Sequence, residues 1–461
     1  MALTFWEIAD VVQATNNWKQ WSDFTINTIE FDSRQLASGS LFIPLGGKTD
    51  GHQFIMDARS QGAKAALWSK ESSLAPEGFP ILEVVDTLKA IQDLAMYYLK
   101  KLAPQVIAVT GSNGKTTTKD MIAAVLAKKY ITYKTQGNYN NQIGLPYTIL
   151  HMPEETEMLV LEMGMDHADE IDFLSQLASP TVAAITMIGE AHIENLGSRQ
   201  EIAKAKMGIT KGLVEDGLLI IPENEPLLKP LTANSTQTIK TFGFTNEADF
   251  VECVQLEEKN KTTFKLSGYQ LPFTIPVPGK YNVDNACIAL IIGKWFQVPE
   301  KEMQQTLAEV HLTKNRTEWV TANNGVEILS DVYNANPTAV SLVLDSFGQM
   351  FTNGRRIVVL GDMLELGATS KMMHQQLSKH LFPAIIQEVF LYGTEMKNLF
   401  LILEKTYGNH VHYYPKMEKE HLIVYLKATL QPNDLLLVKG SNGMRLTEVI
   451  EALTKKEMNR L

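Results

Sequence analysis

A glycine-rich segment between an apolar run and a helical pattern constrains this chain more than any other feature. It reads Thr110-Gly-Ser-Asn-Gly-Lys-Thr-Thr117 and follows the apolar run Val106–Val109. Behind it, apolar residues recur on one helical face, at Met121, Ile122, Val125 and Leu126. A strand, a tight turn and a helix in this order predict a cradle in which backbone N–H groups and the helix N-terminus bind a phosphate.

The side chains of this segment add charge and a metal ligand to the predicted cradle. Lys115 supplies a positive charge for phosphate, and the Thr116 hydroxyl is placed to bind Mg²⁺. The usual P-loop pattern has another glycine where Val109 stands, so this is a shortened variant. A chance Gly-Lys-Thr in an ordinary turn is the alternative, but the flanking strand and helix favour a nucleotide site. Its candidate ligands are Thr110, Gly111, Ser112, Asn113, Gly114, Lys115, Thr116 and Thr117.

Composition is that of a globular enzyme and excludes several other classes. A chain of 461 residues predicts three domains, at about 150 residues per domain. The net charge of −10 argues against a nucleic-acid partner, which usually meets a basic patch. The two cysteines, Cys253 and Cys287, make a disulfide framework or a thiolate metal site improbable.

Neither a membrane span nor a signal peptide is expected. No apolar run reaches the roughly 18 residues that a spanning helix needs. The first residues lack a basic region ahead of an apolar one. We therefore expect a cytoplasmic protein, and a monomer.

The chain divides into three blocks, residues 1–84, 85–313 and 314–461. The first has polar and glycine clusters but no nucleotide motif. In the other two, short apolar runs alternate with helical patterns, as in parallel sheets covered by helices. We predict an α/β fold of three domains: a small N-terminal α/β domain, a central P-loop parallel-sheet domain resembling ATPases, and a C-terminal doubly wound, Rossmann-like domain. The predicted strands are Val106–Val109, Met158–Leu161, Val182–Ile188, Ile357–Leu360, Val389–Tyr392 and Leu435–Val438.

Two polar residues follow strands of the central block. Glu162 directly follows the Met158–Leu161 run, and the carboxyl ends of parallel strands face the crevice in which such sheets bind ligands. Glu162 could therefore hold Mg²⁺ beside Thr116, although a solvated glutamate at a strand end is common. His192 follows the third strand and, beside a phosphate site, is a candidate metal or phosphate ligand.

Lys206 lies on the apolar face of a predicted helix. It comes four residues after Ile202, on the face formed by Ile202, Ala205, Ile209 and Leu213, whereas Lys204 points away. An inward lysine needs a partner or an altered charge. Its ammonium group could instead extend past the apolar face to water. Spacing alone leaves both interpretations open.

The segment 110–117, followed by Glu162, His192 and Lys206 in this order, resembles the Mur ligases, the ATP-dependent amide-forming enzymes of peptidoglycan precursor synthesis. The resemblance implies ATP and Mg²⁺ as cofactors. It also implies that Lys206 is carbamylated and, as an anion, helps His192 to hold a second Mg²⁺. Lys115, His192 and Lys206 are then the catalytic candidates.

Other segments resemble one type of Mur ligase. Asp32-Ser-Arg34, Gly39–Phe42 and Asp50–Phe54 are similar to the UDP-binding domain of the later ligases. Three further segments resemble the ligase that adds D-alanyl-D-alanine, at 137–146, 331–337 and 361–367. The implied substrates are UDP-MurNAc-tripeptide and D-alanyl-D-alanine. The implied substrate-binding residues are Ser33, Arg34, Asn138, Asn140, Asn141, Asn334, Asn336, Lys439 and Ser441.

The resemblance also supplies the remaining nucleotide ligands. It places adenine against residues 279–285, and Asn285 offers a donor and an acceptor, with Asn282 packing nearby. Arg316 and Asp331 are implied at the phosphates and the ribose. Met187 departs from the family, which usually has asparagine before Ile-Gly, and this weakens any hydrogen-bonding role there.

The implied reaction activates the tripeptide carboxylate with ATP as an acyl phosphate, which the amine of D-alanyl-D-alanine then attacks. Three alternatives remain open: another Mur-type or folylpolyglutamate-type amino acid ligase, a P-loop kinase, and a nucleotide-switched binding module. A sibling ligase should lack the segments at 137–146 and 331–337. A kinase would form no amide, and a binding module would hydrolyse ATP slowly without needing an amine.

Overall fold

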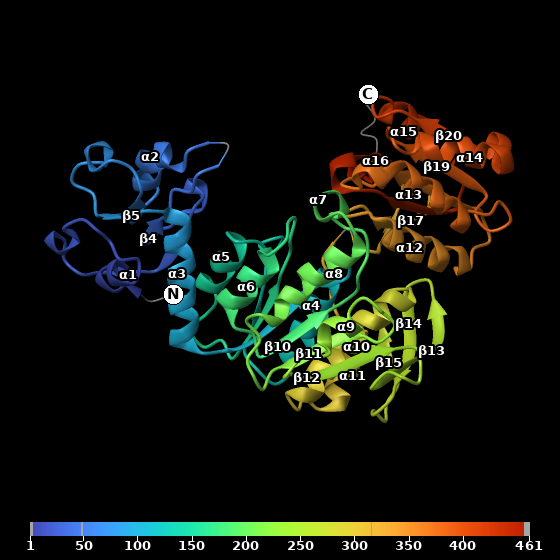
Figure 1. Cartoon of the computed structure of the whole chain (residues 1–461). Coiled ribbons are helices and arrows are strands. Elements are labelled where there is room, and N and C mark those ends of the chain that lie inside the picture. Colours follow the sequence, from blue (N-terminus) through green and yellow to red (C-terminus); the bar gives the residue numbers. More distant parts are fainter. Residues whose placement is uncertain (1–2, 48, 315, 456–461) are drawn as a thin grey trace.

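The computed structural model describes residues 3–47, 49–314 and 316–455. Successive parts of the chain form three α/β bodies, coloured blue, cyan to yellow, and orange to red in Figure 1. Helix α3 (Thr87–Leu102) leads from the first body to the second and packs against α5 (Gly144–Leu150) of the second.

The N-terminal body contains a small parallel sheet in the order β3-β4-β5-β6, with strands Thr28–Glu30, Ser40–Phe42, Ala63–Trp68 and Ile81–Glu83. A two-stranded antiparallel pair, β1 (Leu3–Thr4) and β2 (Thr25–Ile26), lies apart from that sheet. Its helices are α1 (Phe5–Val11) and α2 (Ile55–Ser60).

The central body is built on a nine-stranded sheet in the order β15-β14-β13-β12-β11-β10-β7-β9-β8. The strands from β8 to β13 are parallel to their neighbours, whereas β14 and β15 are antiparallel. The strands are β7 (Gln105–Thr110), β8 (Thr132–Lys134), β9 (Met158–Glu162), β10 (Val182–Ile185), β11 (Leu218–Pro222), β12 (Thr238–Gly243), β13 (Phe250–Glu258), β14 (Lys261–Leu266) and β15 (Phe273–Ile275).

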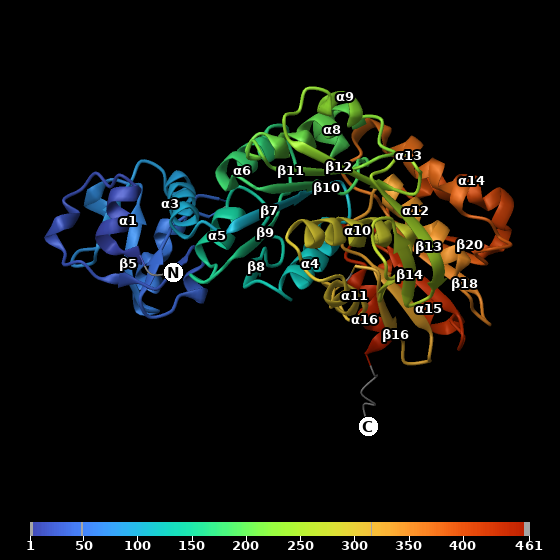
Figure 2. The same cartoon turned by 90° about the horizontal axis from the view of Figure 1, so that it is seen from below.

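Helices cover both faces of this sheet, as Figure 2 shows. Strand residues that alternate along β7 enter two separate apolar clusters, so each face has its own core: Ala108 joins one, and Ile107 and Val109 join the other. All four apolar residues that predicted the helix after the glycine-rich segment are buried. The helices are α4 (Lys115–Leu126), α6 (Glu170–Ala178), α7 (Ile193–Leu196), α8 (Arg199–Met207), α9 (Lys229–Thr232), α10 (Lys280–Trp295) and α11 (Glu300–Ala308).

Strand β10 ends at Ile185, three residues before the predicted end at Ile188. The next residues pair with the glycine-rich loop, because the Thr186 hydroxyl donates to the Asn113 carbonyl oxygen and Ser112 N donates to the Met187 carbonyl oxygen at 2.9 Å. The prediction that the strand continues to Ile188 was therefore wrong. The apolar run continues past Ile185, but residues 186 and 187 bond to the glycine-rich loop.

The C-terminal body has a six-stranded sheet in the order β16-β17-β21-β18-β19-β20, parallel except at the β16 edge. The three predicted strands of this body are confirmed, and helices cover both faces as a doubly wound fold requires. The strands are β16 (Glu318–Thr321), β17 (Glu327–Asp331), β18 (Arg356–Gly361), β19 (Glu388–Tyr392), β20 (Val411–Tyr414) and β21 (Leu435–Lys439). The helices are α12 (Pro337–Gln349), α13 (Ser370–Gln376), α14 (Lys397–Tyr407), α15 (Lys419–Thr429) and α16 (Thr447–Thr454).

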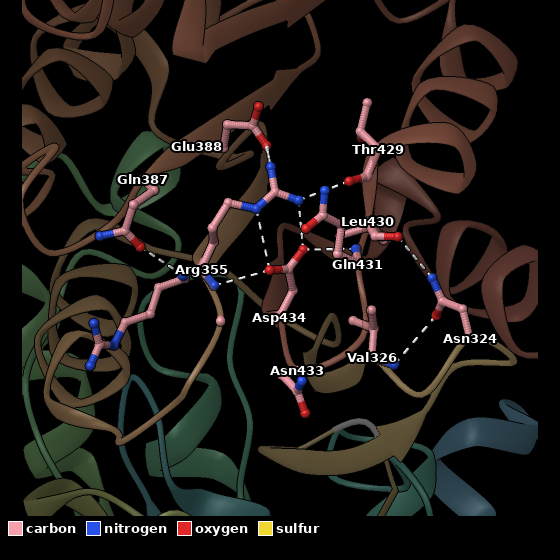
Figure 3. Close-up of polar contacts among 12 residues, drawn as sticks. Asn324, Val326, Arg355, Gln387, Glu388, Thr429, Leu430, Gln431, Asn433 and Asp434 are labelled. Carbon is pink, nitrogen blue, oxygen red and sulfur yellow. Dashed lines mark hydrogen bonds and ion pairs between the residues drawn. The ribbon is translucent and has the colours of Figure 1, made fainter.

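Arg355 joins the amino ends of the strands of this sheet (Figure 3). Its guanidinium donates to Asp434 at 2.6 and 3.2 Å, to Glu388 at 3.0 Å and to the Thr429 carbonyl oxygen at 2.8 Å. These residues precede or begin β18, β19 and β21, so the cluster, here called the Arg355 cluster, lies at the edge opposite the strands' carboxyl ends. Within the described ranges, no helix is both long and apolar enough to cross a membrane.

Candidate active site between two domains

The glycine-rich loop adopts a shape that only glycine fits at two positions. Gly111 and Gly114 have φ angles of +152° and +80°. A Cβ atom at Gly111 would overlap the Thr186 hydroxyl, and one at Gly114 would overlap the Asn285 amide. Helix α4 begins at the next residue, so the loop and the helix N-terminus form one cradle.

Lys115 is half-buried beside this cradle. Its Nζ donates to the Gly111 carbonyl oxygen at 2.8 Å. Burial lowers the pKa of Lys115 most strongly, and the charge of Glu162 partly opposes that shift. Within the described ranges no carboxylate forms an ion pair with Lys115, so Glu162 acts on its charge only from a greater distance.

Two of the predicted metal ligands, Thr116 and Glu162 at the end of β9, bond to each other, and Thr116 also bonds to Arg316. The Thr116 hydroxyl donates to Glu162 Oε2 at 2.8 Å, and Asn140 Nδ2 donates to Glu162 Oε1 at 2.9 Å. Arg316, from beyond the central sheet, donates to Thr116 Oγ1 at 3.0 Å and stacks over the Tyr333 ring at 3.9 Å. Residues distant in sequence therefore surround one hydroxyl–carboxylate pair.

Lys206 occupies the inward face of α8, as its spacing predicted, and its side chain is only 2% exposed. Lys204 is exposed and pairs with Glu201. Burial, and then the charge of Lys115, hold the pKa of Lys206 well below its ordinary range. Among residues 3–47, 49–314 and 316–455 no carboxylate pairs with Lys206, so this amine is buried without a counter-charge.

His192 faces carboxylates from two domains. Its Nδ1 lies 2.7 Å from Glu365 Oε2 and 3.3 Å from Asp166 Oδ1. The His192 charge and hydrogen bond lower the pKa of Glu365. Both His192 and Glu365 adopt left-handed backbone conformations, an uncommon choice for residues with a side chain. The contact therefore joins two strained loops across the domain boundary.

These side chains meet in a polar cavity of about 270 Å³ between the central and C-terminal domains. Most of the predicted catalytic, metal and substrate candidates line it. They are Lys115, Asn138, Asn140, Glu162, His192, Lys206, Asn334 and Ser441, and the predicted nucleotide ligands Ser112, Asn113, Gly114 and Arg316 line it as well.

A second cavity of about 450 Å³ lies on the other side of the glycine-rich loop. The predicted residues that line it are Asn113, Gly114, Thr117, Asn282, Asn285, Arg316, Asp331, Asn334 and Lys439. The amides of Asn282 and Asn285 bond to each other at 3.2 Å, and Thr118 donates to Asn285 Oδ1 at 3.0 Å. The side-chain amide of Asn285 thus holds α10 against α4, and Asn285 also borders the cavity.

Candidates from the C-terminal domain are tied together at the carboxyl ends of β17 and β21. Lys439 Nζ donates to Asp331 Oδ2 at 2.5 Å and to the Asn334 carbonyl oxygen at 2.9 Å. Ser441 Oγ accepts from Leu364 N at 2.9 Å. Asn336 is buried and caps α12 by accepting from Ala339 N at 3.0 Å.

Four substrate candidates line neither cavity: Asn336, which caps α12, and Ser33, Arg34 and Asn141. Ser33 and Arg34 lie in a short 3₁₀ helix of the N-terminal body, where Arg34 pairs with Asp32. Asn141 Oδ1 accepts from Ile143 N at 3.1 Å and from Gly144 N at 2.9 Å, at the start of α5.

Sequence reasoning missed several residues of the site. Glu365 lies within the segment 361–367 that was singled out, but its contact with His192 depends on docking of two domains. Tyr333 was named only as part of a motif, although it stacks on Arg316. Glu190 stands two residues before His192 and was not considered. A search for carboxylates next to the metal candidates in sequence would have found Glu190 but not Glu365.

Family models match almost the whole chain. The Mur ligase family catalytic domain matches residues 25–99, the Mur ligase middle domain matches 109–293, and the Mur ligase glutamate ligase domain matches 315–442. A UDP-N-acetylmuramoyl-tripeptide–D-alanyl-D-alanine ligase of Bacillus subtilis (strain 168) is 41% identical, covering 98% of each chain. The enzyme of the same name from Escherichia coli (strain K12) is 30% identical, again over 98% of each chain.

Solved structures agree with these sequences. A crystal structure of MurF from Acinetobacter baumannii superimposes with a TM-score of 0.89, at 27% identity and 99% coverage of each chain. MurF ligase from Thermotoga maritima in complex with ADP gives a TM-score of 0.81, at 25% identity over 95% of this chain and 98% of that one. The chain belongs to the Mur ligase family.

Proposed function

We propose that this chain is the ATP-dependent ligase that joins D-alanyl-D-alanine to UDP-N-acetylmuramoyl-tripeptide. One observation carries the proposal: Lys115 and Lys206, neither of which forms an ion pair with a carboxylate of the described residues, meet Glu162 and His192 in a cavity between domains. Such a site suits anions, and the substrates of this reaction are a carboxylate and a polyphosphate. The name of the relatives that align over nearly the whole chain supports the same reaction.

In the first step, the terminal carboxylate of the tripeptide attacks the γ-phosphorus of ATP. A new O–P bond forms, the bond to the β-phosphate oxygen breaks, and ADP leaves with the electron pair. Two anions must approach each other, so the barrier falls where fixed cations meet the transferring group. Lys115 and Arg316 provide this charge from two domains.

In the second step, the neutral amine of D-alanyl-D-alanine attacks the acyl carbon. A C–N bond forms, the C–O bond to phosphate breaks, and the amine loses a proton. Water competes with the amine for an acyl phosphate, so a cavity enclosed by two domains favours amide formation over hydrolysis. Asn334 and Ser441, at the C-terminal side of the cavity, are proposed to face the amine substrate.

The residues present suit Mg²⁺. The Thr116 hydroxyl and the Glu162 carboxylate are oxygen ligands 2.8 Å apart, buried beside the cradle. The described residues contain no cluster of three or more His, Cys, Asp and Glu side chains that could hold a metal. Mg²⁺ commonly takes one or two carboxylates and fills its remaining positions with phosphate oxygens and water. Bound there, it would neutralise phosphate charge and polarise the γ-phosphate.

We also propose that Lys206 carries a carbamate. A neutral amine attacks CO₂: a C–N bond forms, one C–O π bond breaks and a proton is released, so the neutral amine becomes an anion. The lowered pKa of Lys206 supplies the neutral amine, and a carbamate would offset the Lys115 charge and provide an oxygen ligand near His192. Carbon-13 NMR with labelled bicarbonate should show a carbamate signal that is absent in Lys206→Ala.

The proposed division of labour follows the three blocks 1–84, 85–313 and 314–461, each of which contains its own sheet. Residues Ser33 and Arg34 of the first block would contact the UDP part of the substrate. ATP would lie between the second and third blocks, because Arg316 and Asp331 border the same cavity as the glycine-rich loop.

Mass spectrometry of the reaction products tests the function. The chain should convert UDP-MurNAc-tripeptide, ATP and D-alanyl-D-alanine into the UDP-linked pentapeptide, ADP and phosphate. A stable phosphorylated product without amide would indicate a kinase. ATP hydrolysis that is independent of the amine would indicate a binding module, and activity only with another amino acid would indicate a sibling ligase.

A further inference from the structure

Helix α12, the first helix of the C-terminal domain, forms one wall of the larger cavity. In both views it lies on the side of its domain that faces the central domain (Figures 1 and 2). Its cavity-lining residues are Thr338, Ala339, Leu342 and Val343. The helix belongs to one domain, whereas the loop that cradles the phosphate belongs to the other.

A carboxylate of the central domain binds the N-terminus of this helix. Glu190 accepts from Thr338 N at 3.0 Å and from the Thr338 hydroxyl at 2.8 and 2.9 Å. Glu190 is buried, and a carboxylate at a helix N-terminus is favoured by the helix dipole. The preceding residue, Gly189, donates from its backbone N to Ser112 Oγ at 2.8 Å. Glu190 therefore connects α12 to the glycine-rich loop through the backbone of its neighbour Gly189.

A second central glutamate binds the same helix farther along. Glu257, at the end of β13, accepts from the Ser346 hydroxyl at 2.8 Å. The same carboxylate oxygen accepts from Gly279 N at 3.0 Å, immediately before α10 begins. Thr338 and Ser346 are separated by about 12 Å along the helix axis, at the usual rise per residue. The two contacts therefore fix both the position and the direction of α12.

We propose that Glu190 and Glu257 are positioning residues that hold α12 in place as a wall of the nucleotide cavity. Contacts between domains of one chain usually permit relative motion. These two carboxylates tie the wall to the phosphate loop on one side and to the start of α10, which carries Asn282 and Asn285, on the other. The inference rests on the proposed function, in which this cavity binds ATP.

Calorimetric titration of the full chain with ADP tests the inference. Loss of the charge-assisted contacts in Glu190→Ala should weaken ADP binding by about tenfold or more. The KM for ATP should rise by a similar factor, while the KM for UDP-MurNAc-tripeptide stays unchanged. Glu190→Gln should restore part of the affinity, because its amide oxygen can still accept from Thr338 N.

Glu300→Ala is the matched control. Glu300 accepts from two backbone N–H groups, Gln270 N at 2.7 Å and Leu271 N at 2.6 Å, within the central domain and away from both cavities. It should bind ADP as the wild type does. A general loss of stability would instead weaken both variants equally and would contradict the inference.

Thr338→Val and Ser346→Ala keep the inference testable if Glu190→Ala does not fold. Each removes one hydroxyl donor and should weaken ADP binding by a smaller factor. Combining Thr338→Val with Glu190→Ala should add almost nothing to the effect of Glu190→Ala alone. Folded variants that bind ADP as tightly as the wild type would overturn the positioning role of Glu190 and Glu257 but would leave the proposed function standing. A wild-type chain that binds no ADP would overturn the proposed function, and this inference with it.

Discussion

Arg355 and the lysine pair Lys115 and Lys206 are cations in parallel-sheet domains, and their surroundings differ sharply. Arg355, at the amino ends of the C-terminal strands, donates to two carboxylates and a carbonyl oxygen. Lys115 and Lys206 lie at the carboxyl-end crevice of the central sheet, where no carboxylate of the described chain pairs with either. A charge that is paired with an opposite charge stabilises the fold. A charge held inside the protein without such a partner lowers stability and is available to a ligand.

The pKa directions follow the same division. Burial tends to raise the pKa of Asp434, but hydrogen bonds from Arg355 and from Gln431 N, together with the charge of Arg355, outweigh burial and lower it. At the cavity, burial lowers the pKa of Lys115 and Lys206, and few carboxylates oppose the shift. ATP and the tripeptide carboxylate would bring the negative charge that the cavity lacks.

The largest expected effect is on turnover in Lys115→Ala. We expect a loss of about a thousandfold or more, since phosphoryl transfer depends on positioned charge. The thermal unfolding midpoint should stay near that of the wild type. Activity is measured as ADP release that depends on both substrates, and near-normal turnover would remove the argument from the glycine-rich loop.

Lys206→Ala should be nearly inactive, and short carboxylic acids should partly restore activity if a carboxylate is what the variant lacks. The related variant Lys206→Met should unfold at the same temperature as the wild type or higher, because it removes a buried amino group that pairs with no carboxylate of the described residues. An unmodified Lys206 in a crystal supplied with Mg²⁺ and bicarbonate would refute the carbamate.

Arg355→Met should have the opposite pattern. Removing one partner of a partly buried pair leaves Asp434 and Glu388 without their cation, and we expect unfolding free energy to fall by about 2 kcal/mol, less than for a fully buried pair. Urea denaturation measures this difference. Turnover per folded molecule should be unchanged, and lost turnover in fully folded protein would mean that the Arg355 cluster acts on the site.

The smallest expected effect is a change with pH in the difference in unfolding free energy between the wild type and Arg355→Met. A carboxyl group whose pKa is lowered by folding stabilises the fold above its unfolded pKa and loses that contribution as pH falls through its folded pKa. The gap between wild type and Arg355→Met should therefore shrink as pH drops below about 4. A gap that stays constant down to pH 2 would show that Asp434 does not carry the effect.

Local sequence patterns predicted the parts that depend on local physics. The strand, glycine-rich turn and helix around Lys115 follow from short-range periodicity and backbone freedom. The inward direction of Lys206 follows from helical spacing alone. The order of three α/β domains follows from alternation of apolar runs and helices, and the structure and its relatives confirm it.

Contacts across the domain boundary could not be predicted in the same way. His192 meets Glu365, and Glu190 meets Thr338, only because two separately folded domains dock. The hydrogen bonds of Asn141 to the backbone at the start of α5 were also missed, since an asparagine in a polar loop accepts from nearby backbone N–H groups as readily as it binds a ligand. Sequence spacing does not distinguish these uses.

Lys115, which pairs with no carboxylate of the described residues, is expected to bind the ligand. Arg355, which pairs with Asp434 and Glu388, is expected to stabilise the fold. A paired measurement on Lys115→Met and Arg355→Met tests both expectations most directly, with ADP affinity by calorimetry and unfolding free energy by urea for each variant. We expect Lys115→Met to lose ADP affinity by at least about tenfold while its unfolding free energy stays the same or rises. We expect Arg355→Met to lose unfolding free energy and to keep its ADP affinity. A Lys115→Met variant that loses unfolding free energy but binds ADP as the wild type does would contradict the assignment of Lys115 to the ligand.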